Sequence, residues 1–192
     1  KFLKKLNIKK YSKQIKLYGI SSMMTKFALS NISVVFSIAL LKNNMEFTLL
    51  KDIKNYAIIF TIIGYFIVKK ANLKNREVIV SIIVEIACVL SILLAYWNSY
   101  LLILVIGLQT VNSLIELAGR FKILERDTYK ENMVEKNAII DIVVYIAQAC
   151  SSVILLNLEF ERAIGLVSIL IIISVVLKMP MMESNQVLPK EV

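Results

Sequence analysis

The run GRFKILERDTYKENMVEKN, residues 119–137, decides how this chain folds, because it leads directly into the apolar stretch 138–157. The run is dense in Lys, Arg, Asp and Glu, whereas the stretch after it is long enough to cross a bilayer. Charged side chains at this density are excluded from hydrocarbon. We therefore predict that residues 119–137 form a loop on one side of a membrane and fix the side to which the neighbouring helices return.

The composition is that of a membrane protein. Of the 192 residues, 58% are hydrophobic, against about 45–50% in an average soluble domain, and the excess lies in long runs. The chain has no histidine, which excludes histidine-based zinc sites and Ser-His hydrolases. No nucleophile–base pair and no metal-ligand set is visible, so we predict neither an enzyme nor a cofactor.

Six hydrophobic segments approach the roughly 20 residues that a helix needs to cross the hydrocarbon. We predict an all-α, polytopic bundle of six transmembrane helices over residues 21–178. A basic segment (1–20), whose first 16 residues can form an amphipathic helix on the inner leaflet, precedes it, and a flexible tail (179–192) with both prolines follows. The six spans are predicted at 21–41, 53–69, 77–96, 99–118, 137–157 and 162–178, with a tight aromatic turn at 96–100.

The positive charges predict the orientation. With the amino terminus inside, 18 of the 23 Lys and Arg residues lie in inner segments, while Lys42, Lys51, Lys54 and Arg162 lie outside. The positive-inside rule then places both termini of this multi-pass protein on the cytoplasmic side. The richness in Lys, Ile and Asn is typical of an AT-rich bacterial genome, so we expect the bacterial plasma membrane. The net charge of +9 is explained by lipid-facing topogenic residues, so we predict a lipid bilayer and no nucleic acid as partner.

Two connecting runs resemble those of a known family. The run YKENMVEKN, residues 129–137, resembles the connection between the fourth and fifth helices of major facilitator superfamily transporters. Residues 64–76 stand where that family has a G-x-x-x-D-R-x-G-R-R gate loop, but only Gly64 and the basic character remain. The resemblance spans roughly residues 17–178 and implies one six-helix half of a transporter. Such a half is a fragment, pairs with a second copy or another membrane subunit, or no longer transports.

Three predicted spans carry polar side chains on one helical face. Because polar groups inside a membrane are costly, we predict that these faces line a shared cavity for a small-molecule substrate. The candidate residues are Lys26, Ser30 and Ser33 on the first span, Gln109, Asn112 and Glu116 on the fourth, and Tyr145 and Gln148 on the fifth, where Asp141 shares their face.

Glu85 lies near the middle of the third predicted span among apolar neighbours. Glu85 and Asp141 are the candidate proton carriers of a coupled transporter. Each also has a structural interpretation. Glu85 would be neutral or paired with Lys26, and its hydrogen bonds would hold neighbouring helices together. Asp141 would stabilise the amino terminus of its helix electrostatically. Glu116 is predicted to pair with Arg120, one turn further along.

Three functions follow from these patterns. The leading one is a secondary transporter that moves a small molecule, with protons exchanged in the opposite direction. The second is the substrate-binding subunit of an energy-coupling-factor importer, although the first span lacks an A-x-x-x-A docking face. The third is an immunity or accessory protein that binds a toxin or secretion partner and does not transport. Five glycines and the altered gate loop favour this third function.

Overall fold

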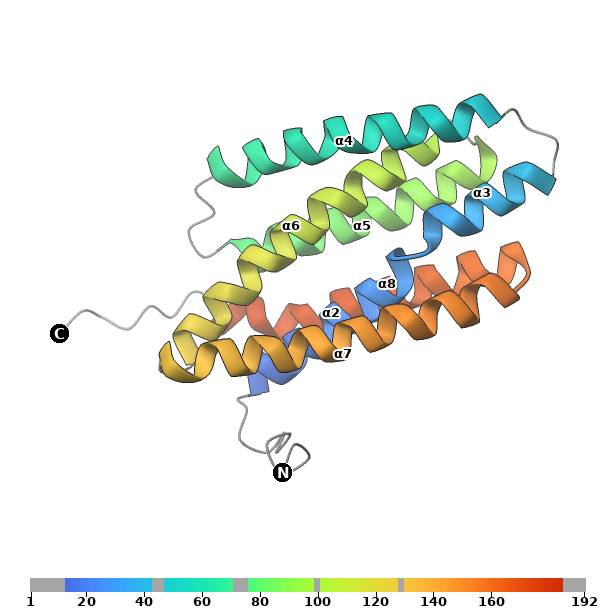
Figure 1. Ribbon diagram of the computed structural model, residues 1–192. Coiled ribbons are helices and arrows are strands. Elements are labelled where there is room, and N and C mark those ends of the chain that lie inside the picture. The colour runs from blue at the N-terminus through green and yellow to red at the C-terminus, as the bar shows by residue number, and fades with distance from the viewer. Residues whose placement is uncertain (1–12, 43–46, 71–75, 99–100, 128–129, 185–192) are drawn as a thin grey trace.

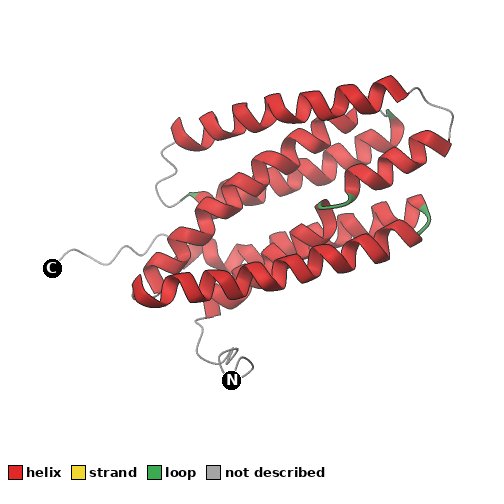
Figure 2. Cartoon of the chain, viewed as in Figure 1, coloured by secondary structure: helices red, strands yellow, loops and turns green. Residues whose placement is uncertain are grey.

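The computed structural model describes residues 13–42, 47–70, 76–98, 101–127 and 130–184. In these ranges the chain is helical apart from short connections (Figure 2) and contains no strand. The predicted all-α class is therefore confirmed. The predicted amphipathic helix at 1–16 falls outside the described residues, apart from its last four. The helices are α2 (Lys13–Leu29), α3 (Ile32–Lys42), α4 (Phe47–Lys70), α5 (Glu77–Trp97), α6 (Leu102–Asp127), α7 (Lys130–Asn157) and α8 (Phe160–Ser184).

Four helices are long and apolar enough to cross a membrane. They contain the stretches Glu77–Trp97, Leu102–Arg120, Val134–Asn157 and Phe160–Met182. The 21 residues of α5 extend about 30 Å, which equals the thickness of the hydrocarbon layer. By length and composition this is the helical, multi-pass membrane protein that the sequence predicted. The prediction of six continuous spans is confirmed for four of them and is not met by the other two.

The first predicted span is divided into α2, of 17 residues, and α3, of 11, and each is shorter than a membrane span. The division falls at Ser30 and Asn31, residue types that favour helix ends over helix interiors. The Asn31 carbonyl accepts the N–H of Val35 at 3.0 Å and so opens α3. The Asn31 amide donates to Ser151 at 3.0 Å and to Ser152 at 3.1 Å, which ties the division to α7.

The second predicted span is the helix α4, which lies at the edge of the bundle against α6 (Figure 1). Charged residues near both of its ends leave only residues 55–68 uncharged, which is too short for a continuous apolar span. A glycine allows α4 to approach α6 closely. A Cβ atom at Gly107 would lie 2.7 Å from the ring of Phe60.

The described part of the charged run, residues 119–127 and 130–137, is helical rather than a loop, so that prediction is wrong. Helix α6 continues to Asp127 and α7 begins at Lys130, because Lys, Arg and Glu favour helices wherever they are hydrated. Helix α8 likewise continues through Pro180 to Ser184, so the predicted tail begins as helix. Between the third and fourth predicted spans, α5 ends at Trp97 and α6 begins at Leu102. Residues 99–100 of the predicted turn lie outside the described residues.

The centre of the bundle is formed by α2, α5, α6 and α8, with α7 packed on α2. Helix α2 begins and α8 ends at the same end of the bundle (Figure 1). Two apolar clusters fill the interior. One surrounds Phe36 and Ile92, and the other surrounds Val78 and Leu124. Between them along α2, α5 and α8 lies a layer of buried polar and charged side chains, and this layer holds the candidate site.

Candidate functional site

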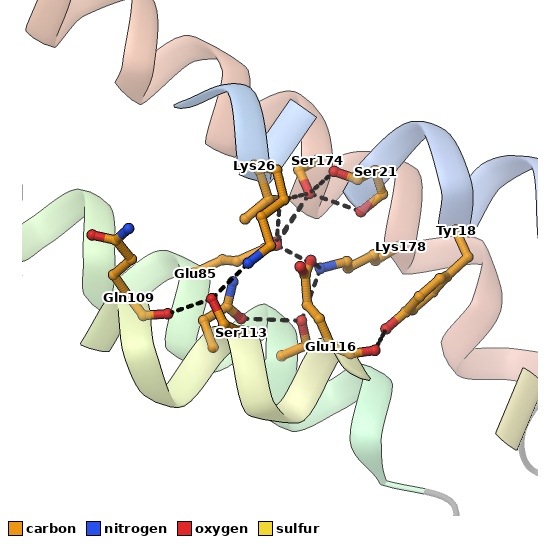
Figure 3. A network of polar contacts seen from close by, with 12 residues as sticks. Tyr18, Ser21, Lys26, Glu85, Gln109, Ser113, Glu116, Ser174 and Lys178 are labelled. Atoms are coloured by element: carbon orange, nitrogen blue, oxygen red, sulfur yellow. Dashed lines mark hydrogen bonds and ion pairs between the residues drawn. The ribbon is translucent and has the colours of Figure 1, made fainter. Parts of the chain in front are cut away.

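The ammonium group of Lys178, on α8, is the centre of this polar layer (Figure 3). Lys178 is 0% exposed. Its Nζ atom donates to a carboxylate oxygen of Glu85 at 2.5 Å and of Glu116 at 2.9 Å, and to the Ser81 hydroxyl at 2.8 Å. These three acceptors match the three protons of an ammonium group. Lys178 therefore joins α8 to both α5 and α6.

Glu85 is equally buried and joins α5 to α2 and α8. The Thr25 hydroxyl donates to Glu85 Oε1 at 2.7 Å. The Ser174 hydroxyl lies 3.2 Å from Oε1 and 3.3 Å from Oε2, and it contacts the hydroxyls of Ser21 and Thr25 at 2.8 Å. The carboxylate thus lies among hydroxyl groups from two other helices, which hold its orientation (Figure 3).

The two carboxylates and the ammonium form the charge network, which we define as Glu85, Glu116 and Lys178. With all three groups ionised, the charge network carries one net negative charge in a buried position. An excess buried charge is unfavourable unless it is compensated. Uptake of one proton makes the network neutral, and Lys178 can then pair with the carboxylate that remains ionised. This arrangement can bind and release a proton inside the bundle.

Glu116 connects the charge network to a polar cavity. Two adjoining hollows of about 110 Å³ and 300 Å³ lie between α2, α6 and α7, and both are lined by Lys26, Ser113, Glu116 and Gln148. Together they are the polar cavity. The smaller hollow is also lined by Ser30, Gln109 and Asn112, and the larger by Ser22, Arg120, Asp141 and Tyr145.

Two cations lie in the wall of the polar cavity. Lys26 Nζ donates to Ser113 Oγ at 2.9 Å. Arg120 forms an ion pair with Asp141, which links α6 to α7. The amide of Asn137 donates to the other oxygen of Asp141 at 3.1 Å. Both oxygens of Asp141 are therefore engaged within the protein.

The structure brings the three predicted polar faces together. Seven of the eight residues predicted to line a substrate cavity lie in the wall of the polar cavity, and these are Lys26, Ser30, Gln109, Asn112, Glu116, Tyr145 and Gln148. The side chain of the eighth, Ser33, lies outside the described residues. Contact of these residues with a substrate stays a prediction.

The predicted pairings of the acidic residues are wrong. Glu85 pairs with Lys178 rather than Lys26, and Glu116 pairs with Lys178 rather than Arg120. For Glu116, a contact between crossing helices has replaced the predicted contact within one helix. Asp141 does not lie at a helix amino terminus, because α7 begins at Lys130. The further role of Glu85 and Asp141 as proton carriers stays a prediction.

Lys178 was missed as a site residue, because a lysine at the end of a predicted span resembles a cytoplasmic charge. The serines and threonine around Glu85 were missed as well. One signal was present in the sequence. Ser81 and Glu85 lie four residues apart, as do Ser174 and Lys178, so each pair occupies one face of its helix.

A comparison with known proteins finds no matching family, no matching curated protein and no matching solved structure. The resemblance to major facilitator transporters therefore stays a prediction. Inferences about function depend on the geometry of the charge network and the polar cavity.

Proposed function

We propose that this protein is a membrane carrier for a small molecule and that the charge network couples transport to a proton. One observation carries the proposal. Glu116 belongs to a buried network with one excess carboxylate and also lines the polar cavity. Ionisable groups inside membrane bundles characteristically mark ion and proton pathways. Asp141 is already paired with Arg120, so the proton is assigned to the Glu85–Glu116 pair.

The proposal includes the two helical segments that fall short of a continuous apolar span. We place α2–α3 and α4 in the bilayer beside the four apolar spans, as in one half of a major facilitator transporter. Membrane proteins tolerate a divided helix where the division is buried or lines a cavity, and Ser30 lines the polar cavity. The positive-inside rule turns the end with most cations toward the cytoplasm of a bacterial cell.

A second copy of the chain, or another membrane subunit, completes the proposed carrier. The polar cavity is open along α7, where Tyr145 is 68% exposed and Gln148 is exposed as well. Polar groups that face lipid are unfavourable. A second half packed against this side would cover them and close the cavity.

Proton movement in proteoliposomes tests the carrier. A dye inside the vesicles reports pH while a panel of small organic acids, amines and neutral metabolites is added outside. We expect at least one compound to change the internal pH with wild-type protein. Glu85→Gln is expected to abolish the response. Glu159→Gln is the matched control, because Glu159 is 75% exposed in a surface ion pair with Arg162. A full response in both Glu85→Gln and Glu116→Gln would contradict proton coupling through the network.

A second function, a non-transporting immunity or accessory protein, is favoured by the complete hydrogen bonding of Lys178. All three ammonium protons have acceptors, which suits a bundle held in one conformation. A protein of this kind would protect cells from a toxin or support a secretion partner. Protection without any flux, retained in Glu85→Gln, would favour this function over the carrier.

A further inference from the structure

Residues that line the larger hollow of the polar cavity carry hydrogen-bond donors that have no acceptor. The hydroxyl of Ser22 and the Nε atom of Arg120 are buried without a hydrogen-bond partner, and Ser22 is only 4% exposed. Lys26 donates to Ser113 and forms no ion pair with any described residue. An ammonium group has three protons to donate. Three side chains on α2 and α6 that line one hollow of about 300 Å³ thus have free donor capacity.

The acidic groups in the same wall are already held in ion pairs with cations. Glu116 is held by Lys178 and Asp141 by Arg120. Buried donors without acceptors are rare in native proteins, because each costs the free energy of its lost hydration. The hollow is therefore complementary to a ligand that accepts hydrogen bonds and carries negative charge. The remaining wall includes the apolar side chains of Leu114, Leu117 and Val144.

We propose that the polar cavity binds an oxyanion, the carboxylate or phosphate of a small organic ligand. The anionic oxygens lie against Lys26, Ser22 and Arg120, and a short organic body packs on the apolar wall. This inference rests on the proposed function in one respect, since it takes the bound oxyanion to be the molecule that the carrier transports. Binding itself is a property of the cavity and can be measured without transport.

The charge network determines whether the proton moves with the anion or against it. Glu116 lines the hollow and also belongs to the network, so an anion at Lys26 experiences the excess negative charge. Protonation of the network removes that charge and strengthens anion binding. Because such coupling is reciprocal, a bound anion also favours proton uptake. The proton and the oxyanion therefore bind together and move in the same direction, in contrast to the exchange expected from the sequence.

Calorimetric titration of the purified full chain in detergent tests the anion site, with benzoate as the probe and uncharged benzamide as its matched control. We expect benzoate to bind and benzamide to bind at least about tenfold more weakly, because a charge-assisted hydrogen bond is lost. Lys26→Met is expected to weaken benzoate binding about 10- to 100-fold and Ser22→Ala about 2- to 10-fold. Lys26→Arg keeps most of the affinity. Lys13→Met, at the exposed start of α2, is the matched control and binds as wild type does.

Nanodiscs distinguish a free organic acid from a lipid headgroup. If the phosphate of an anionic lipid occupies the cavity, benzoate binds more weakly in phosphatidylglycerol than in phosphatidylcholine, and Lys26→Met removes this difference. If the ligand is a free acid, phosphatidylglycerol weakens benzoate binding only through its surface charge, and Lys26→Met leaves that difference unchanged. Equal binding of benzoate and benzamide would overturn the proposal, as would wild-type benzoate affinity in Lys26→Met. Benzoate binding without flux of any tested compound would contradict the carrier and leave the anion site in place.

Discussion

Replacement of Lys178 by methionine is the most informative perturbation of the charge network. Methionine fills a similar volume but removes the positive charge and all three hydrogen bonds. Two buried carboxylates then share one region without a cation, and the net charge of the network changes from −1 to −2. By the same reasoning, Glu85→Gln changes the net charge to zero and leaves Lys178 paired with Glu116.

The size of the effect follows from these charges. Removing one partner of a buried ion pair costs about 3–5 kcal/mol, so we expect Lys178→Met to lower the free energy of unfolding by at least that amount. Glu85→Gln keeps one balanced pair and should cost about 1 kcal/mol or less. In the double variant, Glu85→Gln removes one of the two unpaired carboxylates. The double variant should therefore be more stable than Lys178→Met alone.

Cysteine labelling supplies the assay. Cys88 is 0% exposed within an apolar cluster, whereas Cys150 is exposed. In a Cys150→Ser background, a thiol-reactive dye reports unfolding through Cys88 during titration with SDS in mixed micelles. Lys13→Met, on the exposed start of α2, is the control and should change stability by less than about 0.5 kcal/mol.

Two results would refute this reasoning. If Lys178→Met cost less than about 1 kcal/mol, the ammonium group would not compensate the buried carboxylates. If Glu85→Gln were as destabilising as Lys178→Met, the loss would come from packing or hydrogen bonding rather than from net charge.

Three further variants test the packing around the site in the same labelling assay. Gly107→Leu should lower the free energy of unfolding by about 1–3 kcal/mol, because its Cβ atom would lie 2.7 Å from Phe60. Wild-type stability in this variant would show that α4 does not pack closely on α6. Tyr18→Phe removes the hydrogen bond that the hydroxyl donates to the Glu116 carbonyl and should cost about 1 kcal/mol; no change would place that hydroxyl in water. Asn31→Ala removes donors to three serine hydroxyls and should lower the free energy of unfolding by about 0.6–2 kcal/mol. An increase in stability would contradict the interhelical role of the amide.

The polar cavity was within reach of sequence reasoning because helical periodicity is local. Residues at spacings of three, four and seven share one helical face whatever the rest of the fold does, so Lys26, Gln109, Glu116 and Gln148 were grouped correctly. The sequence also showed that polar faces on three helices must avoid lipid. These two facts were sufficient to predict a common cavity without knowledge of the helix crossings.

The ion pairs could not be predicted in the same way, because they depend on which helices cross at which depth. Lys178 is distant in sequence from Glu85 and Glu116, and its place near the end of α8 gave no sign of burial. Division of the first span at Asn31 was also hidden, because hydropathy does not report the hydrogen bonds that an asparagine makes with another helix.

The most direct test of coupling between network and cavity counts the protons bound together with the anion. Benzoate is titrated into the purified protein between pH 6 and pH 9 in buffers of different ionisation enthalpy. With wild-type protein, we expect uptake that approaches one proton per bound benzoate over part of this range. In Glu85→Gln the network is already neutral, and we expect uptake near zero with binding retained. Proton release on binding, or equal uptake by Glu85→Gln, would contradict the coupling of the charge network to the polar cavity.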